Sequence, residues 1–135
     1  WNDGENAGFS SAETWLEVNR NYKQINAAEQ ENCEKSVLKF YRELIALRRN
    51  SRYSSVIVDG EFVPFYTEDV FIIAYLRILG NKELLVIHNY QNREGGIRIP
   101  EGIWERVTGN RELKGNIGRR YCLKPYECIA LYKGD

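Results

Sequence analysis

The spacing of the hydrophobic residues changes at about residue 52, and this change limits the folds open to the chain. Before it, apolar side chains recur every three or four residues, which is the period of an amphipathic helix. After it, β-branched and aromatic residues stand in short runs separated by Gly, Asn, Asp and Pro. Such a pattern is typical of antiparallel β-sandwiches and barrels. The predicted fold class is mainly β: an antiparallel β-sandwich preceded by one amphipathic helix and an irregular loop.

The clearest predicted element is a helix over residues 34–50. Glu34 lies in its first turn and Arg48 and Arg49 in its last, as the helix dipole favours. A capping-box spacing from Asn26 to Glu29 predicts a short helical turn upstream. The apolar stripe of the main helix is formed by Val37, Phe40, Tyr41, Leu44 and Ile45.

The remainder of the chain is predicted to form short strands joined by turns. Pro64 and Pro100 fall at strand ends or edges, where a missing N–H is tolerated. The turn candidates are Asp59-Gly60, Gly80-Asn81, Gly109-Asn110 and Lys124-Pro125-Tyr126. The predicted strands span residues 55–58, 62–66, 70–79, 83–90, 96–99, 104–108, 121–123 and 127–132.

Residues 1–32 are acidic, with six acids against two bases, and are rich in Asn, Gly and Ser. They nevertheless carry many apolar side chains, which a free linker would not keep. We expect them to lean on a larger body, and removed from it their exposed aromatics favour self-association. These side chains are Trp1, Phe9, Trp15, Leu16, Val18, Tyr22 and Ile25.

The organisation suggests the end of one domain followed by another. Residues 1–51, a loop and one helix, are too few to build a core, whereas residues 52–135 can form one. The first residue is Trp1 and the chain has no Met, so we expect a cut inside a longer reading frame.

Composition excludes several classes of partner. The 19 Lys+Arg balance 19 Asp+Glu, which removes the electrostatic case for a nucleic acid or an anionic membrane. No apolar run approaches the roughly 18 residues of a membrane span, and no signal peptide is visible. Cys33, Cys122 and Cys128 match no metal pattern and fit free thiols in a reducing compartment, so we expect a cytoplasmic location and neither a metal nor a cofactor.

Catalytic motifs are weak. His88 is the only histidine and lies in an apolar run, which favours a packed strand residue over a ligand or a general base. Glu68 and Asp69 are adjacent, and adjacent strand residues point to opposite faces. Asp3 and Glu5 beside Trp1 could line a sugar site, although loop packing and turn capping are the explanation that we favour.

Aromatic residues in the β region suggest a second kind of site. If exposed, they could form a platform on which sugar rings stack, with Trp104 and Tyr126 as the leading candidates. The alternative is that they belong to the core, which is the usual place for aromatics at strand spacing. The full set is Tyr53, Phe65, Tyr66, Trp104 and Tyr126.

Four segments together resemble bacterial α-glucosidases of the α-amylase clan, in particular the branch of oligo-1,6-glucosidases, dextran glucosidases and trehalose-6-phosphate hydrolases, whose C-terminal part sucrose isomerases share. The first is Trp1-Asn2-Asp3-Gly4-Glu5-Asn6-Ala7-Gly8-Phe9, and the second runs from Trp15 to Asn26. The third is the helix segment 36–48. The fourth is the ending Leu123-Lys124-Pro125-Tyr126-Glu127 with Ala130-Leu131-Tyr132.

The resemblance implies that residues 1–51 are the end of a (β/α)8 catalytic barrel and residues 52–135 a C-terminal β domain. It implies a retaining α-glucosidase acting on short α-linked glucosides, whose three catalytic carboxylates lie on earlier barrel strands and have no counterpart here. The expected partner is therefore the rest of the same polypeptide, and an oligosaccharide only for the whole enzyme. Cys33-Glu34 departs from the Asp-Pro that commonly opens the last barrel helix.

The same resemblance places the Trp1–Phe9 segment on the active face of the barrel. Trp1 and Asp3 are thus the residues expected nearest to substrate, the alternative being a turn that only anchors the loop. For the β region two roles stay open. It either shields and stabilises the barrel, which we favour, or acts as a carbohydrate-binding β module.

Overall fold

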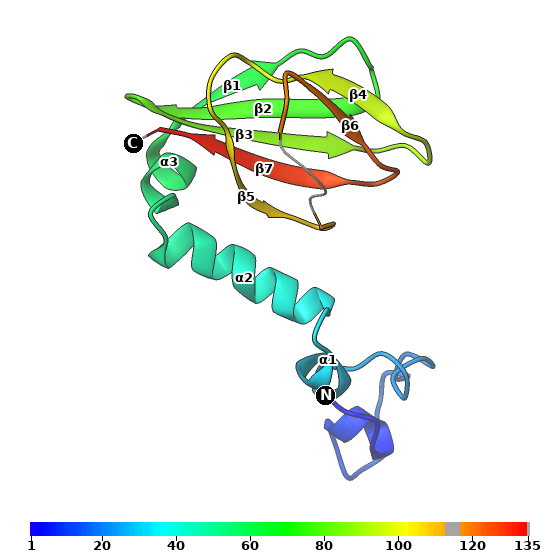
Figure 1. Cartoon of the computed structure of the whole chain (residues 1–135). Helices are drawn as coiled ribbons and strands as arrows, with labels where there is room; N and C mark the ends of the chain where they lie inside the picture. Colours follow the sequence, from blue (N-terminus) through cyan, green and yellow to red (C-terminus); the bar gives the residue numbers. More distant parts are fainter. Residues whose placement is uncertain (113–116, 135) are drawn as a thin grey trace. The chain divides into compact units, whose positions relative to one another are not determined.

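The computed structural model describes residues 1–112 and 117–134 (Figure 1). It divides into two compact units, Trp1–Ser51 and Arg52–Asp135, which we call the N-terminal unit and the β unit. Helices make up the regular structure of the first unit, and strands make up most of the second.

Capping side chains set where the helices of the N-terminal unit begin. After a short 3-10 turn, η1 (Glu5–Gly8), helix α1 (Ala27–Asn32) starts at the predicted capping box, because the Asn26 side chain accepts a hydrogen bond from the Glu29 N–H at 2.8 Å. Helix α2 (Val37–Asn50) begins later than residue 34, because Ser36 Oγ is its cap and accepts from the backbone N–H at the third helical position. The helix predicted over 34–50 is otherwise confirmed.

Helix α2 leaves its apolar stripe uncovered within the N-terminal unit. None of its described side chains is fully buried, and Val37, Tyr41 and Ile45 are more than half exposed. Residues spaced by four lie above one another on a helix, so these three side chains form one ridge. The apolar face of α2 is therefore not buried by the other residues of its own unit.

The β unit begins with helix α3 (Ser54–Asp59), where the sequence predicted a strand over 55–58. Tyr53, Val56 and Ile57 pack into one hydrophobic cluster, with Val56 fully buried. A strand would send Val56 to the face opposite Tyr53 and Ile57, so only a helix buries all three together. The predicted strand is wrong because so short a β-branched run does not reveal its own period.

Seven strands follow, and they lie close to the remaining predicted ranges. They form a five-stranded antiparallel sheet in the order β1-β2-β3-β7-β5 and a two-stranded antiparallel sheet of β4 and β6, which confirms the predicted antiparallel β architecture. Pro64 lies on β1, an edge strand, as expected. The bounds are β1 (Glu61–Phe65), β2 (Ile72–Leu79), β3 (Lys82–Asn89), β4 (Gly95–Arg98), β5 (Glu105–Gly109), β6 (Arg120–Leu123) and β7 (Cys128–Lys133).

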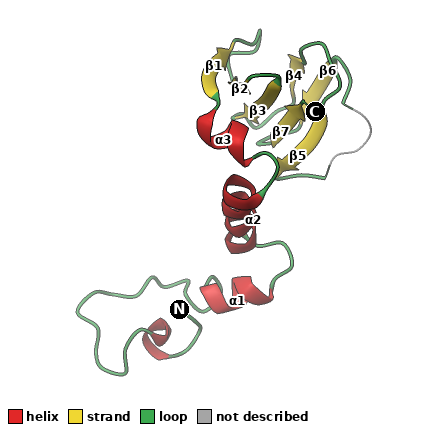
Figure 2. Ribbon diagram, turned by 90° about the vertical axis from the view of Figure 1, so that its left-hand side faces the viewer, coloured by secondary structure: helices red, strands yellow, loops and turns green. Residues whose placement is uncertain are grey.

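The five-stranded sheet is covered differently on its two faces. The β4–β6 pair lies against one face and α3 against the other, as Figure 2 shows from the side. The main core fills the space between the two sheets and includes Leu85, Ile87, Leu123 and Leu131, all buried. A smaller cluster lies under α3. The inner face is therefore closed, whereas the outer face is covered at one end only.

Two further observations concern membrane spans and cysteines. Among the described residues, no helix is long and apolar enough to cross a membrane. The three cysteines stand as free thiols.

Candidate functional site

The Trp1–Phe9 segment folds into a tight turn held by its own amides. The Asn2 N–H donates to the Ala7 carbonyl at 3.0 Å, and the Gly4 N–H donates to Asn2 Oδ1 at 2.9 Å. Asn6, Ala7 and Gly8 follow one another with φ angles of 51°, 55° and 74°. Three successive left-handed residues are costly unless their surroundings enforce them. Here they are enforced by these hydrogen bonds and by the complete burial of Ala7.

Beside this turn, the N-terminal unit contains a hollow of about 720 Å³. Trp1 and Phe9 stack at 6.4 Å on one part of it, and the Trp1 indole donates to the Ile25 carbonyl at 3.4 Å. Glu13 and Glu17 also line the hollow. No sequence pattern pointed to these two acids, because only the folded loop brings them beside Trp1.

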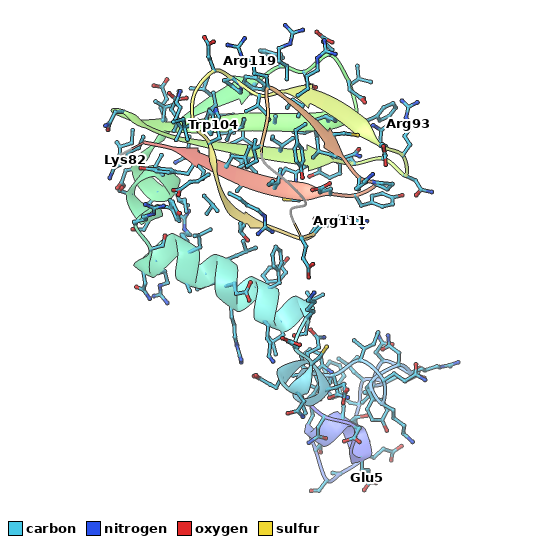
Figure 3. The ribbon with its side chains drawn as sticks, viewed as in Figure 1. Glu5, Lys82, Arg93, Trp104, Arg111 and Arg119 are labelled. Carbon is cyan, nitrogen blue, oxygen red and sulfur yellow. The ribbon has the colours of Figure 1, made fainter. Side chains whose placement is uncertain are left out.

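The structure separates the two residues that the resemblance led us to expect near substrate. Trp1 lines the hollow, whereas Asp3 does not. Asp3 is exposed and, within residues 1–112 and 117–134, makes no hydrogen bond or ion pair. Its carboxylate is thus available to groups outside the unit, and Glu5, seen at the tip of the turn in Figure 3, is exposed as well.

Trp104 is a core residue and not an exposed platform. Its side chain is 8% exposed, its indole N–H donates to the Pro100 carbonyl at 2.9 Å, and Lys133 Nζ lies 5.1 Å from its ring centre. The expectation that this ring could stack on a sugar is therefore corrected: the ring fills the space between the two sheets. Tyr126 is exposed, with a φ of 56°, but it has no platform with Trp104.

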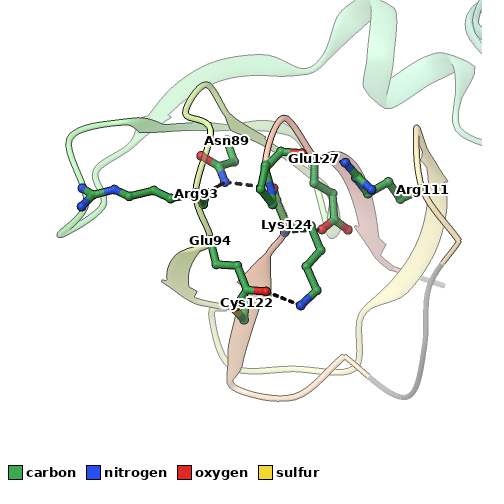
Figure 4. A network of polar contacts seen from close by, with 8 residues as sticks. Asn89, Arg93, Glu94, Arg111, Cys122, Lys124 and Glu127 are labelled. Atoms are coloured by element: carbon green, nitrogen blue, oxygen red, sulfur yellow. Dashed lines mark hydrogen bonds and ion pairs between the residues drawn. The ribbon is translucent and has the colours of Figure 1, made fainter.

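A polar network ties together the loops at one end of the β unit (Figure 4). The buried Asn89 donates to the carbonyl oxygens of Arg93 and Lys124 at 2.8 and 2.9 Å. The buried Glu127 accepts from the Lys124 N–H and from the Tyr121 hydroxyl, each at 2.7 Å. Burial and this carboxylate raise the pKa of Tyr121, so its hydroxyl stays protonated and donates. These groups satisfy one another, which fixes the loops.

His88 is a strand residue, as predicted, and lies on the outer face of the large sheet. Its Nε2 is 3.9 Å from Cys128 Sγ on the neighbouring strand β7. Burial lowers the pKa of His88 and raises the pKa of Cys128, so both groups are neutral near pH 7. A neutral thiol beside a neutral imidazole is not an activated nucleophile.

The lowered pKa of His88 makes stability depend on pH. The unfolded chain binds a proton near pH 6.5, whereas the folded chain binds it only at lower pH. The contribution of neutral His88 to the free energy of unfolding is therefore fully present above pH 6.5, and it is lost as the pH falls through the pKa of the folded state. Urea unfolding at pH 7.5, 6.5 and 5.5 should show this loss, and His88→Gln should flatten it. An unchanged pH profile in His88→Gln would contradict the assignment.

The described residues contain no group of three His, Cys, Asp or Glu side chains placed to hold a metal ion.

Comparison with known proteins gives a consistent family. Residues 1–59 match the family model of the α-amylase catalytic domain. The chain is 44% identical over 131 residues to a probable oligo-1,6-glucosidase of Bacillus subtilis, covering 94% of this chain and 23% of that protein. It is 31% identical over 136 residues to the trehalose-6-phosphate hydrolase of the same species, covering 96% of this chain and 24% of that protein.

Solved structures agree with the sequence relatives. Trehalose-6-phosphate hydrolase of Bacillus licheniformis superposes with a TM-score of 0.88 at 30% identity, over 100% of this chain and 25% of that one. Isomaltulose synthase of Klebsiella superposes with a TM-score of 0.87 at 30% identity, over 98% of this chain and 24% of that one. The chain thus spans about a quarter of the length of these relatives. Residues 1–59 thus match the α-amylase catalytic domain, and the chain as a whole resembles the C-terminal part of the α-glucosidases in the oligo-1,6-glucosidase and trehalose-6-phosphate hydrolase branch.

Proposed function

We propose that the chain works as the C-terminal part of a retaining α-glucosidase, in which it supplies structure and a neighbouring catalytic body supplies the chemistry. Relatives named oligo-1,6-glucosidase and trehalose-6-phosphate hydrolase support a substrate of the short α-glucoside class. Retention needs two carboxyl groups about 5–5.5 Å apart, one as nucleophile and one as acid/base. From the resemblance we expect both to lie outside these residues.

The observation that carries the structural role is the outer sheet face, by which we mean Phe62, Ile73, Tyr75, His88 and Tyr90. These side chains share one face, since Ile73 pairs with His88 across strands and two ring contacts link Phe62 to Tyr75 and His88 to Tyr90. Phe62, Ile73 and Tyr90 are more than half exposed. A contiguous apolar surface of this kind is typical of an interface.

The position of α3 indicates what covers this face. The catalytic-domain family match runs to residue 59 and so includes α3, which packs on β2 and β3 at one end of the outer sheet face. The uncovered part continues directly from that contact. We therefore assign it to the catalytic body, whose apolar surface would bury the ring and methyl groups.

A chimera tests this proposal. The chain replaces the matching part of the Bacillus subtilis probable oligo-1,6-glucosidase, and hydrolysis of an aryl α-glucoside is measured. We expect no turnover from the isolated 135 residues and activity from the chimera. Phe62→Lys combined with Tyr90→Lys should lower the melting temperature of the chimera and its yield of active enzyme, because two charges would be buried unpaired.

The matched control is Tyr126→Lys. Tyr126 is 59% exposed, against 56% for Phe62, but it does not belong to the outer sheet face. Tyr126→Lys should leave the melting temperature of the chimera and its yield of active enzyme unchanged. Turnover by the purified chain alone, or a chimera indifferent to the double substitution, would contradict the structural role.

For the N-terminal unit we propose that the turn at Trp1–Phe9 borders the substrate region of the whole enzyme. The proposal is supported by the hollow beside Trp1, by the exposed carboxylate of Asp3 and by the enforced left-handed backbone of the turn. The uncovered ridge of α2 is separate support for an adjoining catalytic body, because such a body could cover its exposed apolar side chains.

A further inference from the structure

The outer surface of the β4–β6 pair carries a groove. Two hollows of about 400 and 370 Å³ share Glu68, Gly96, Ile97 and Arg98 in their linings, so they adjoin. The larger lies within the roughly 300–1,000 Å³ of small-molecule sites. Its floor is open at Gly96, where an added Cβ would meet nothing within 4 Å. Ile97 and Ile99 lie below as part of the core, so the floor is rigid.

Polar side chains in this groove have unused hydrogen-bonding capacity. Arg98 on β4 and Arg120 on β6 are direct cross-strand neighbours, an arrangement in which like charges repel. Within residues 1–112 and 117–134, the side chains of Arg98, Arg120 and Glu68 make no hydrogen bond or ion pair. Guanidinium donors and a carboxylate acceptor thus stand side by side along one hollow.

The rim of the groove carries one ion pair and one exposed aromatic ring. Arg119, which stands at the edge of the β unit in Figure 3, pairs with Glu101, and both side chains are largely solvated. Tyr66, directly after β1, is 91% exposed and lines the same hollow. The larger hollow is thus lined by an aromatic face, two acids and two arginines, and its charges cancel.

These features define the ligand chemistry. A sugar ring presents an apolar C–H face, which packs on an aromatic ring, and a rim of hydroxyls, each able both to donate and to accept. Arg98 donates and Glu68 accepts, so a hydroxylated ring satisfies both at once. In the larger hollow the charges of two acids cancel those of two arginines, so no net positive charge attracts a phosphate.

We propose that the β4–β6 groove binds a neutral oligosaccharide, with one sugar ring against Tyr66 and its hydroxyls hydrogen-bonded to Arg98 and Glu68. The site differs from the one expected from the sequence, because Trp104 is buried and Tyr126 does not line the groove. The choice of α-linked glucans as probes rests on the proposed function, whereas the groove itself does not.

Direct binding tests the site without any need for activity. The full chain is run in native gels containing dextran and is titrated calorimetrically with isomaltotriose and with inorganic phosphate. We expect retardation by dextran and heat of binding with the trisaccharide. Tyr66→Ala and Gly96→Trp should each weaken binding at least tenfold, the first by removing the ring and the second by filling the floor.

Tyr126→Ala is the matched control, since it removes an exposed tyrosine outside the groove, and its binding should be unchanged. Circular dichroism verifies that all variants keep their fold. Three results would each overturn the proposal. The chain binds neither dextran nor isomaltotriose, both groove variants bind as tightly as the parent chain, or only phosphate gives heat of binding. An inactive chimera with intact dextran binding would instead count against the proposed function only.

Discussion

Replacing Trp104 by alanine should lower the free energy of unfolding by about 3–5 kcal/mol. The indole is buried between the two sheets, and its removal leaves a cavity next to Ile99, Leu131 and the other core side chains. It also leaves the Pro100 carbonyl without its N–H donor. Urea denaturation followed by far-UV circular dichroism measures the change.

Tyr126→Ala serves as the comparison for that measurement. An exposed side chain away from special packing changes stability by about 0.5 kcal/mol or less. If Trp104→Ala were as mild as Tyr126→Ala, the indole would have to be a surface group after all, and the assignment of Trp104 to the core would be wrong.

Gly60→Ala should destabilise the β unit by about 3 kcal/mol, near the upper end of typical overpacking costs. An added Cβ would lie 2.4 Å from the Val56 carbonyl oxygen and 3.2 Å from the backbone nitrogen of Ile78. Both neighbours are backbone atoms, so neither can rotate away. The contact sits where α3 ends, and the Gly60 N–H donates to that same carbonyl at 3.2 Å.

Gly96→Ala is the matched control, because a Cβ at Gly96 meets nothing within 4 Å. Its free energy of unfolding should stay within about 0.5 kcal/mol of the parent chain. Equal melting temperatures for the two alanine variants would show that Gly60 does not approach the Val56 carbonyl and β2 as closely as described.

The period of the hydrophobic residues was sufficient to predict the antiparallel β architecture and helix α2. It failed at α3, because the β-branched run Val56–Val58 is too short to show a helical repeat, and only burial of Val56 distinguishes a helix from a strand. It also could not tell whether Trp104 was buried or exposed. That depends on which strands stack, which is a property of the paired sheets and not of a single segment.

The candidate sites were harder to predict than the fold for the same reason. Arg98 and Arg120 are far apart in the chain, and only the β4–β6 register makes them neighbours. Glu13 and Glu17 reach the hollow beside Trp1 through an irregular loop with no period to follow. By contrast, Asn26 could be identified as a cap because capping acts over three residues.

Helix α3 sets where this chain can be joined to the corresponding part of a related protein. The family match ends at residue 59, which suggests a crossover after α3, yet α3 covers Leu84, Ala130 and Tyr132 of the β unit. Recombination at residue 60 would pair those side chains with a foreign helix. Recombination at residues 51–52 transfers the helix together with the sheet that it covers. Hybrid proteins joined there should tolerate far greater sequence divergence between their two parents than hybrids joined at residue 60.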